Sequence, residues 1–517
     1  MKKRYLVLSF LSAFLLSSCS GLNKKGSGDI VHLNISTFDG GFGSNWLEDM
    51  ADAFEGVYPN VKINIKTFLN YSNIEAMLSA DIYECDLLVS ITNNTRGGVN
   101  GLFLPLNDVL ESKANETETK TIGEKMGEIS ESEYIVFNNE KNAYQMPIHL
   151  GTTGMYYNKS SLDSMYPSGY QLPVTTDEMV AMCDDIKNND LGWGLVYTTE
   201  TDAEYAIYMR DILQSQYMGL EAFNNYYDGK YEKDGEYVFA DDMQDMVDKW
   251  HEARLSSLEF LTKLYNLDNG YAPKSVKQMD FSLAQAYFWG VTSYADYKPT
   301  AFMINGDWLY NEVEYLQEYK VRDIRPMRAP INSAIIDNLS SITSDAQLAE
   351  CIRYIDGVLE NKVSEKPKYI SDSDLVRLTE ARKMVWTTHN QSTASIPFNS
   401  KCPDEAKEFL RFIASDDGCS IYSTNLQGKS SLYNKDIVDV SKQNEYTKSL
   451  NKITSNMIAI TQRNTALGCI GGLSLFGYLY FSKDLSNGVT AESILSKFEN
   501  EIVASWPEIK TRSGYGQ

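Results

Sequence analysis

Apolar and polar side chains alternate along the first part of the chain with two different periods. Residues 31–36 alternate one by one, the period of a β-strand, and residues 45–58 place apolar side chains every three or four positions, the period of a helix. The same pattern predicts a strand at 61–68, a helix near 72–80 and an apolar strand at 86–91. Strands that alternate with helices at this spacing indicate an α/β fold whose parallel sheet is covered on both faces.

Helical spacing dominates further along the chain. A helix-rich block is predicted at about 176–315, because residues 175–178 carry the chemistry of a helix start and apolar positions then recur at helical intervals. Another helix is predicted to begin near 400–405, where Pro403 stands in the first turn with carboxylates beside it. Two further helical segments fit between about residues 337 and 385.

The N-terminus has the pattern of a secretory leader. Basic residues precede an apolar stretch at 5–16, and small residues then lead to Cys19. The stretch spans about 18 Å as a helix, short of the roughly 30 Å hydrocarbon core, so we expect residues 1–18 to be a signal peptide. Residues 16–19 resemble a bacterial lipobox, which implies a lipid on Cys19; the alternative is an ordinary signal peptide with a chance cysteine. Residues 19–29 would form a flexible tether.

Composition and charge restrict the possible partners. The chain has 517 residues and a formal net charge of -23, and such an acidic surface repels phosphate backbones, so we expect no nucleic acid partner. It also has 34 Tyr and 7 Trp, whose flat rings suit both protein cores and the apolar faces of sugars. The cysteines after Cys19 form no C-x-x-C pair and no Cys/His cluster, so we expect isolated thiols, no metal site and no cofactor.

Several short motifs lie in the same order as in a known family. Residues 53–63 read AFEGVYPNVKI, residues 152–159 read TTGMYYNK and residues 301–308 read AFMINGDW. With these motifs the chain resembles the extracellular solute-binding lipoproteins of ABC importers, sugar-binding type, in the superfamily of maltose-binding protein. The other stretches that carry the resemblance are 104–108, 145–147, 396–401, 406–410 and 487–492.

The resemblance implies a two-lobed periplasmic-binding-protein-like fold of type II, with crossover strands as an interlobe hinge and the ligand cleft between the lobes. The helical segments at about 337–385 depart from the usual pattern. We interpret them as a helical insertion in lobe one, and a lid at the cleft rim or a docking surface for a partner are the alternatives. The implied crossings lie near 149–153, 326–330 and 415–425. The implied lobes are 30–150 plus 330–415 for lobe one and 151–325 plus 420–517 for lobe two.

A sugar presents apolar C–H faces and a ring of hydroxyls, so its site needs aromatic planes together with hydrogen-bonding groups. Trp308 is the first candidate, because the resemblance aligns it with a tryptophan that stacks on the sugar; a packing tryptophan is the alternative. Trp46 lies outside the apolar stripe of its helix, and His149 lies at the expected hinge, where a structural histidine is the alternative. The candidate ligand-binding residues are Trp308, Asp307, Trp46, Asp39, Tyr71, His149, Glu204, Tyr205, Trp386 and His389.

These observations predict a monomeric receptor, lipid-anchored at Cys19 on the extracellular face of the cell membrane. It would capture a carbohydrate, above all an oligosaccharide, by hinge closure and deliver it to the permease subunits of an ABC transporter. We expect no enzyme, because the chain lacks a G-x-S-x-G nucleophile elbow and an H-E-x-x-H zinc motif. Two alternatives stay open: the same fold binding a non-sugar solute, and a surface glycan adhesion or sensing module that does not serve transport.

Overall fold

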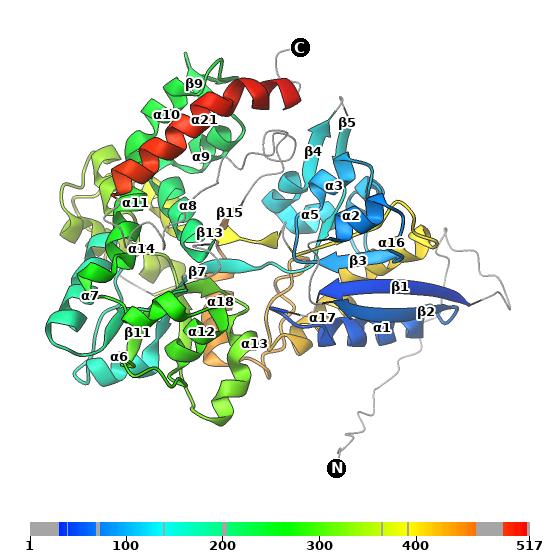
Figure 1. Cartoon of the computed structure of the whole chain (residues 1–517), viewed down its shortest axis with the longest axis horizontal. Helices are drawn as coiled ribbons and strands as arrows, with labels where there is room; N and C mark the ends of the chain where they lie inside the picture. The colour runs from blue at the N-terminus through cyan, green and yellow to red at the C-terminus, as the bar shows by residue number, and fades with distance from the viewer. Residues whose placement is uncertain are drawn as a thin grey trace.

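Two α/β lobes lie side by side in the computed structural model of the protein, and several chain segments cross between them (Figure 1). The predicted signal peptide, Cys19 and the tether lie outside the described residues, as do the candidates Asp39 and Tyr71. The structure describes residues 30–38, 40–68, 73–137, 140–198, 204–362, 365–389, 392–461 and 490–513.

Lobe one contains a five-stranded sheet with the order β2-β1-β3-β14-β6. β1 pairs in parallel with β2 and β3, and β14 returns antiparallel to β3, so the parallel strands predicted from the alternating pattern are confirmed. The apolar faces of α1 and α16 pack together beside this sheet, where Phe54 meets Phe409 edge to face with ring centroids 5.2 Å apart. The elements of lobe one are β1 (Val31–Phe38), α1 (Asn45–Val57), β2 (Val61–Phe68), α2 (Ile74–Ser79), β3 (Leu87–Ser90), α3 (Thr95–Val99), α4 (Asn107–Leu110), α5 (Ile122–Met126), η1 (Gly127–Glu133), β4 (Tyr134–Phe137), β5 (Glu140–Ala143), β6 (Met146–Pro147), β14 (Thr393–Ser395), α16 (Pro403–Ile413) and α17 (Asp416–Asn425).

Lobe two contains a six-stranded sheet in which β15, β13, β7, β11 and β8 follow one another and β12 also pairs with β7. Its core is the larger of the two and includes the helix-rich block predicted at 176–315. In Figure 1 the C-terminal helix α21 lies at one end of this lobe, where it packs against α11. The elements of lobe two are β7 (Thr152–Asn158), α6 (Lys159–Met165), α7 (Thr176–Asn188), β8 (Trp193–Leu195), α8 (Glu204–Met218), α9 (Leu220–Tyr227), β9 (Lys230–Lys233), β10 (Glu236–Phe239), α10 (Gln244–Lys249), α11 (His251–Tyr265), η2 (Leu267–Asn269), η3 (Lys274–Gln278), α12 (Phe281–Trp289), β11 (Thr300–Gly306), α13 (Leu309–Val313), η4 (Glu314–Glu318), β12 (Ile324–Met327), η5 (Ser333–Asn338), α14 (Asp345–Leu359), α15 (Asp372–Lys383), β13 (Met384–Thr387), α18 (Glu445–Thr454), β15 (Ile458–Ile460) and α21 (Ala491–Ser513).

The helical segments predicted as an insertion in lobe one form α14 and α15, and they lie on lobe two instead. β12 pairs antiparallel with β7, so the chain does not leave lobe two at residues 326–330. Ile331 and Leu348 then share one apolar cluster with Val174, which precedes α7. Asn332 is also held beside α8, because its backbone N–H donates to Gln216 Oε1 at 2.9 Å.

The crossings define the lobe boundaries. The first runs through residues 148–151, between β6 and β7, close to the predicted 149–153. The second joins β13 to β14, and the third follows α17, which packs on α1 in lobe one. After α17 the chain stays on lobe one, because Asn434 bonds to Asp416 and the Asp439 N–H bonds to Ser423. Lobe one therefore comprises about 30–150 plus 388–443 and lobe two the rest of the described chain, which differs from the predicted boundaries at 330 and 415.

Two further predictions concern the membrane and the thiols. In the part of the chain that the structure describes, every helix is too short or too polar to cross a bilayer. The five described cysteines are free and buried, as expected of isolated thiols.

Candidate functional site

The turn after β11 places Asp307 and Trp308 where the two lobes meet. The backbone N–H of Asp307 donates to Thr152 O at 2.8 Å, and Thr152 Oγ1 donates to Asp307 Oδ2 at 3.2 Å. The indole of half-buried Trp308 lies directly over Gly306, where a Cβ would come within 2.3 Å of its ring carbons. A glycine is needed at 306 so that the indole can adopt this position.

Trp308 belongs to a series of five rings, which we call the aromatic row: Phe42, Trp308, Tyr205, Tyr208 and Trp386. Successive ring centroids are 6.2, 6.2, 6.1 and 5.8 Å apart. The first ring comes from the loop between β1 and α1 in lobe one, and the other four come from lobe two. Trp386 is buried, whereas the other four rings are half-buried and offer part of their surface.

Buried side chains of lobe one pack against the Phe42 ring. The Phe42 ring stacks on His149 with centroids 4.4 Å apart, and His149 Nδ1 shares a hydrogen bond of 3.0 Å with the Tyr422 hydroxyl. Trp46 contacts the same imidazole edge to face at 5.2 Å, and its indole N–H donates to Gly43 O at 3.0 Å. Trp46 is thus 2 % exposed, although its place outside the apolar stripe favoured the cleft or the surface.

An ion pair joins the two lobes beside the aromatic row. Lys429 Nζ lies 2.7 Å from Asp307 Oδ2 and 3.9 Å from the centroid of the Phe42 ring. Lys429 is 5 % exposed and Asp307 3 % exposed. Burial raises the pKa of Asp307 and lowers that of Lys429, while their mutual attraction opposes both shifts.

A groove of about 510 Å³ opens between the lobes next to Phe42. It is lined by the loop at residues 40–46, by α12, by α13 with the start of η4, and by residues 425–427. Its polar groups are amides, the hydroxyls of Ser282 and Tyr315 and the carboxylates of Glu312 and Glu314, and none of its described lining residues is Lys, Arg or His. Gln427 Nε2 donates to Glu314 Oε2 across the groove at 2.7 Å.

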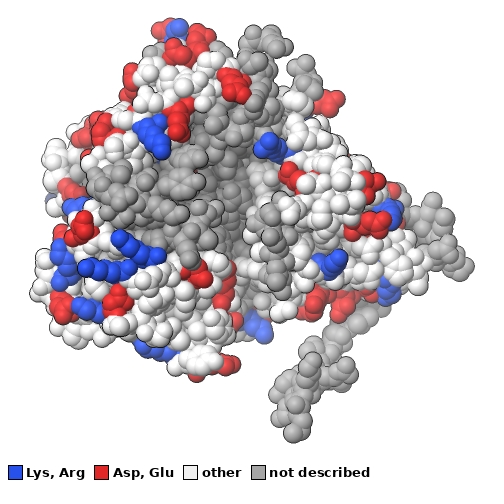
Figure 2. Space-filling view, viewed as in Figure 1, with Lys and Arg blue, Asp and Glu red and all other residues white. Residues whose placement is uncertain are grey.

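The space-filling view shows the charged side chains on one face of the two lobes (Figure 2). Acidic side chains are scattered over both lobes in this view, with basic ones among them, as the net charge of -23 leads one to expect.

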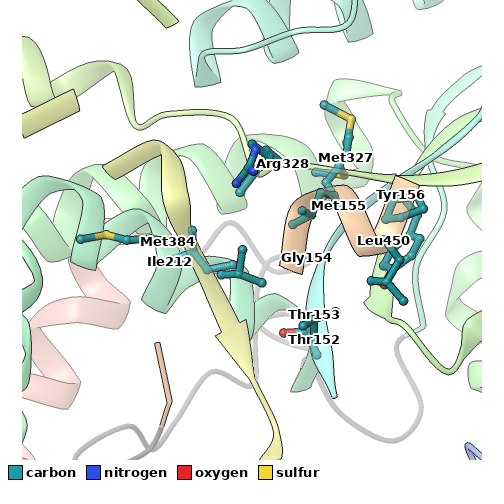
Figure 3. Close-up of a pocket in the computed structure, with 14 residues that line it drawn as sticks. Thr152, Thr153, Gly154, Met155, Tyr156, Ile212, Met327, Arg328, Met384 and Leu450 are labelled. Atoms are coloured by element: carbon teal, nitrogen blue, oxygen red, sulfur yellow. The ribbon is translucent and has the colours of Figure 1, made fainter. Parts of the chain in front are cut away.

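A second cavity lies inside lobe two and differs from the interlobe groove. Figure 3 shows Thr153, Met155 and Met384 around it; the first two belong to β7, and Met384 begins β13. Its volume of about 20 Å³ holds about one water molecule, so it is too small for an organic ligand.

His389 lies on the second crossing but is fully buried. Its Nε2 shares a hydrogen bond of 2.8 Å with Ser132 Oγ, and its Nδ1 shares one of 2.9 Å with Thr387 Oγ1. Burial lowers the pKa of His389 to about 3. The side chain therefore holds the crossing strand against lobe one and does not face a cleft.

The structure thus brings some of the predicted residues together and separates others. Trp308, Asp307, His149 and Tyr205 lie around the junction of the lobes, and Trp386 ends the aromatic row as a buried ring. Glu204 begins α8, next to Tyr205. Sequence reasoning did not identify Phe42, Tyr208, Tyr422 or Lys429; only Phe42 carried a signal, as the aromatic residue in a glycine-rich turn.

A family model described as bacterial extracellular solute-binding protein matches residues 49–322, more than half of the chain. No curated protein sequence matches the chain.

Solved structures share its fold at low sequence identity. The apo form of RafE from Streptococcus pneumoniae has a TM-score of 0.58 at 14 % identity, covering 93 % of this chain and 99 % of RafE. Lmo0181 from Listeria monocytogenes, in complex with cycloalternan, has a TM-score of 0.57 at 12 % identity and covers 93 % and 100 %. The GacH receptor of Streptomyces glaucescens has a TM-score of 0.56 at 13 % identity and covers 93 % and 99 %. The fold is that of the two-lobed solute-binding proteins of type II.

Proposed function

We propose that this chain, which belongs to the bacterial extracellular solute-binding proteins, captures a carbohydrate between its lobes and delivers it to the permease of an ABC importer. The observation that carries the proposal is the aromatic row, which begins in lobe one and continues along lobe two. A ligand lying on it would contact both lobes.

The spacing of the rings favours an oligosaccharide over a single sugar. Phe42, Trp308, Tyr205 and Tyr208 are half-buried and follow one another at about 6 Å, so several sugar rings could each find an apolar surface. Each stacked ring removes tens of Å² from water, which is worth roughly 1 kcal/mol. The titles of structural neighbours name carbohydrate ligands, among them raffinose for RafE, cycloalternan for Lmo0181 and acarbose for GacH, which supports this class.

The polar groups favour a neutral ligand. The groove beside Phe42 offers amides and carboxylates, which accept and donate hydrogen bonds to hydroxyl groups. Lys429, which lies 3.9 Å from the centroid of the Phe42 ring, is already paired with Asp307. An anionic ligand would meet Glu312 and Glu314 without a compensating charge, whereas a neutral sugar would not.

Hinge closure would couple binding to delivery. Because a ligand touches both lobes only when they are close together, it stabilises the closed state selectively. The permease would then recognise that state. We further propose that the receptor acts as a monomer on the extracellular face of the membrane, held by a lipid on Cys19.

The experiment is a thermal-shift screen of mono- and oligosaccharides on the chain without residues 1–18, followed by calorimetric titration of the best ligand. We expect a neutral oligosaccharide to bind and to be recovered unchanged. Trp308→Ala should weaken its binding at least tenfold, which corresponds to about 1.4 kcal/mol.

Trp193→Ala is the matched control, because Trp193 is also half-buried but lies on β8, at the far edge of the lobe-two sheet. It should bind the sugar like the wild type. Stabilisation by a non-sugar solute alone would reject the carbohydrate proposal. Equal affinity of Trp308→Ala and Trp193→Ala would reject the site, and cleavage of the sugar would reject the role of a receptor.

A further inference from the structure

Lys429 lies on lobe one and contacts lobe two, and its backbone N–H donates to Leu426 O at 2.9 Å. It follows α17 and precedes Leu432 and Tyr433, which lie in the core of lobe one. Its neighbours Gly428 and Ser430 instead bond to lobe two, since Asn451 Nδ2 donates to Gly428 O at 2.8 Å and Ser430 N–H donates to Asn451 Oδ1 at 3.3 Å. The Lys429 segment therefore belongs to lobe one and bonds to lobe two through Asn451.

The two contacts of this ammonium group link the ligand-facing turns of the lobes. In lobe two it pairs with Asp307, the residue before Trp308, at 2.7 Å. In lobe one it lies 3.9 Å from the ring centroid of Phe42, a cation–π distance. Phe42 and Trp308, the two rings at the junction of the lobes, are thus held through one side chain.

Asp307 is fixed within lobe two and cannot follow Lys429 toward lobe one. Thr152 O accepts from its backbone N–H, Thr152 Oγ1 donates to its carboxylate, and the Tyr446 hydroxyl donates to its carbonyl oxygen at 3.0 Å. Any separation of the lobes must therefore break the contact of Lys429 with Asp307 or its contact with Phe42. Both contacts are buried, where charges interact more strongly than in water.

We propose that Lys429 is a positioning residue for the interlobe site: its ammonium group ties the Asp307–Trp308 turn to Phe42 and sets how far apart the lobes stand before a ligand arrives. It does this without touching the ligand. Its effect on ligand affinity depends on the proposed function, but its effect on the spacing of the lobes does not.

The test uses variants of the mature chain that keep the shapes of the side chains. Lys429→Met alone would leave Asp307 as a buried unpaired charge and could prevent folding. The double variant Lys429→Met/Asp307→Asn removes both charges, so it leaves no buried unpaired charge and is the variant that tests the proposal. Lys429→Arg retains the positive charge, and Lys362→Met is the control, because the Lys362 side chain is 70 % exposed and lies on lobe two.

Small-angle scattering without ligand measures the spacing of the lobes. We expect the double variant to have a larger radius of gyration than the wild type, and Lys429→Arg and Lys362→Met to match the wild type. Phe42→Leu, which removes the ring but keeps the ion pair, should shift the radius in the same direction. Calorimetry should then show about tenfold weaker sugar binding by the double variant, a typical magnitude for coupling between sites.

Identical scattering curves for the wild type and the folded double variant would overturn the proposal. Unchanged sugar affinity in the double variant would also overturn it. A shift in scattering together with no sugar binding by any protein, the wild type included, would support the positioning role and reject the carbohydrate proposal alone.

Discussion

Glu133→Gln should stabilise the folded protein at neutral pH and flatten the pH dependence of its stability. Glu133 is fully buried in lobe one, and its Oε2 accepts a hydrogen bond of 2.7 Å from Gln145 Nε2. Its Oε1 lies 3.4 Å from His389 Nε2. Burial raises the pKa of Glu133 to about 8, so the carboxyl group is mostly protonated in the folded protein at pH 7.

The magnitude follows from the difference between the folded and unfolded pKa. Because the folded pKa of about 8 lies above the ordinary value of 4.5, the stability contributed by Glu133 is fully present below pH 4.5 and is lost as the pH rises to about 8. At pH 7 the loss is ~3 kcal/mol, taking about 1.4 kcal/mol for each pH unit above 4.5. Glutamine cannot ionise and keeps an amide oxygen for Gln145, so the variant should avoid this loss.

Urea unfolding followed by tryptophan fluorescence at pH 5, 6, 7 and 8 measures the effect as a free energy of unfolding. The difference between Glu133→Gln and the wild type should grow steadily over this range. Glu131→Gln is the matched control, because the Glu131 side chain is 72 % exposed two residues away, and it should follow the wild type. Parallel curves for Glu133→Gln and the wild type would refute the reasoning.

Three further predictions test the packing of the site, the helical hairpin and the thiols. Gly306→Ala should displace the indole of Trp308, weaken ligand binding and lower the free energy of unfolding in urea by about 1–3 kcal/mol. Gly56→Ala in α1 is the control and should be neutral or stabilising, because open space surrounds Gly56. Equal effects of the two variants would contradict the packing of Trp308 on Gly306. Arg382→Met removes a bidentate contact of 2.7–2.8 Å with Asp356 and should make the α14–α15 hairpin more susceptible to limited proteolysis. A variant that resists the protease as well as the wild type does would show that the contact is dispensable. The five described cysteines should react with a thiol reagent only after unfolding, because they are buried and burial raises the pKa of each thiol. Fast labelling of these cysteines in the native protein would contradict this prediction.

Local patterns predicted the elements of the fold better than their assignment to lobes. The strands β1, β2 and β3 and the helix α1 appear where period-two and period-3.6 spacing placed them. The α14–α15 hairpin was also located, but it was assigned to lobe one. Periodicity shows that a helix has an apolar face and does not show which neighbour covers it, and here β12 decides by pairing with β7.

The candidate site shows the same division. Trp308 was predicted through the family resemblance and Tyr205 as a residue at a helix start, and their ring centroids are 6.2 Å apart. Trp46 borders the interlobe groove but is almost fully buried against His149 and Tyr422, which other elements bring to it and which the sequence pattern does not reveal. No sequence motif marks Lys429, because its proposed role depends on contacts with Asp307 and Phe42 that only the folded chain brings together.

A crystal structure of the mature chain with its tightest-binding oligosaccharide tests the central claim most directly. We predict an intact sugar lying along the aromatic row, with one ring on Trp308 and contacts to Phe42 in the facing lobe. A sugar bound elsewhere on either lobe, or one held by a single lobe with Trp308 uncovered, would contradict the account.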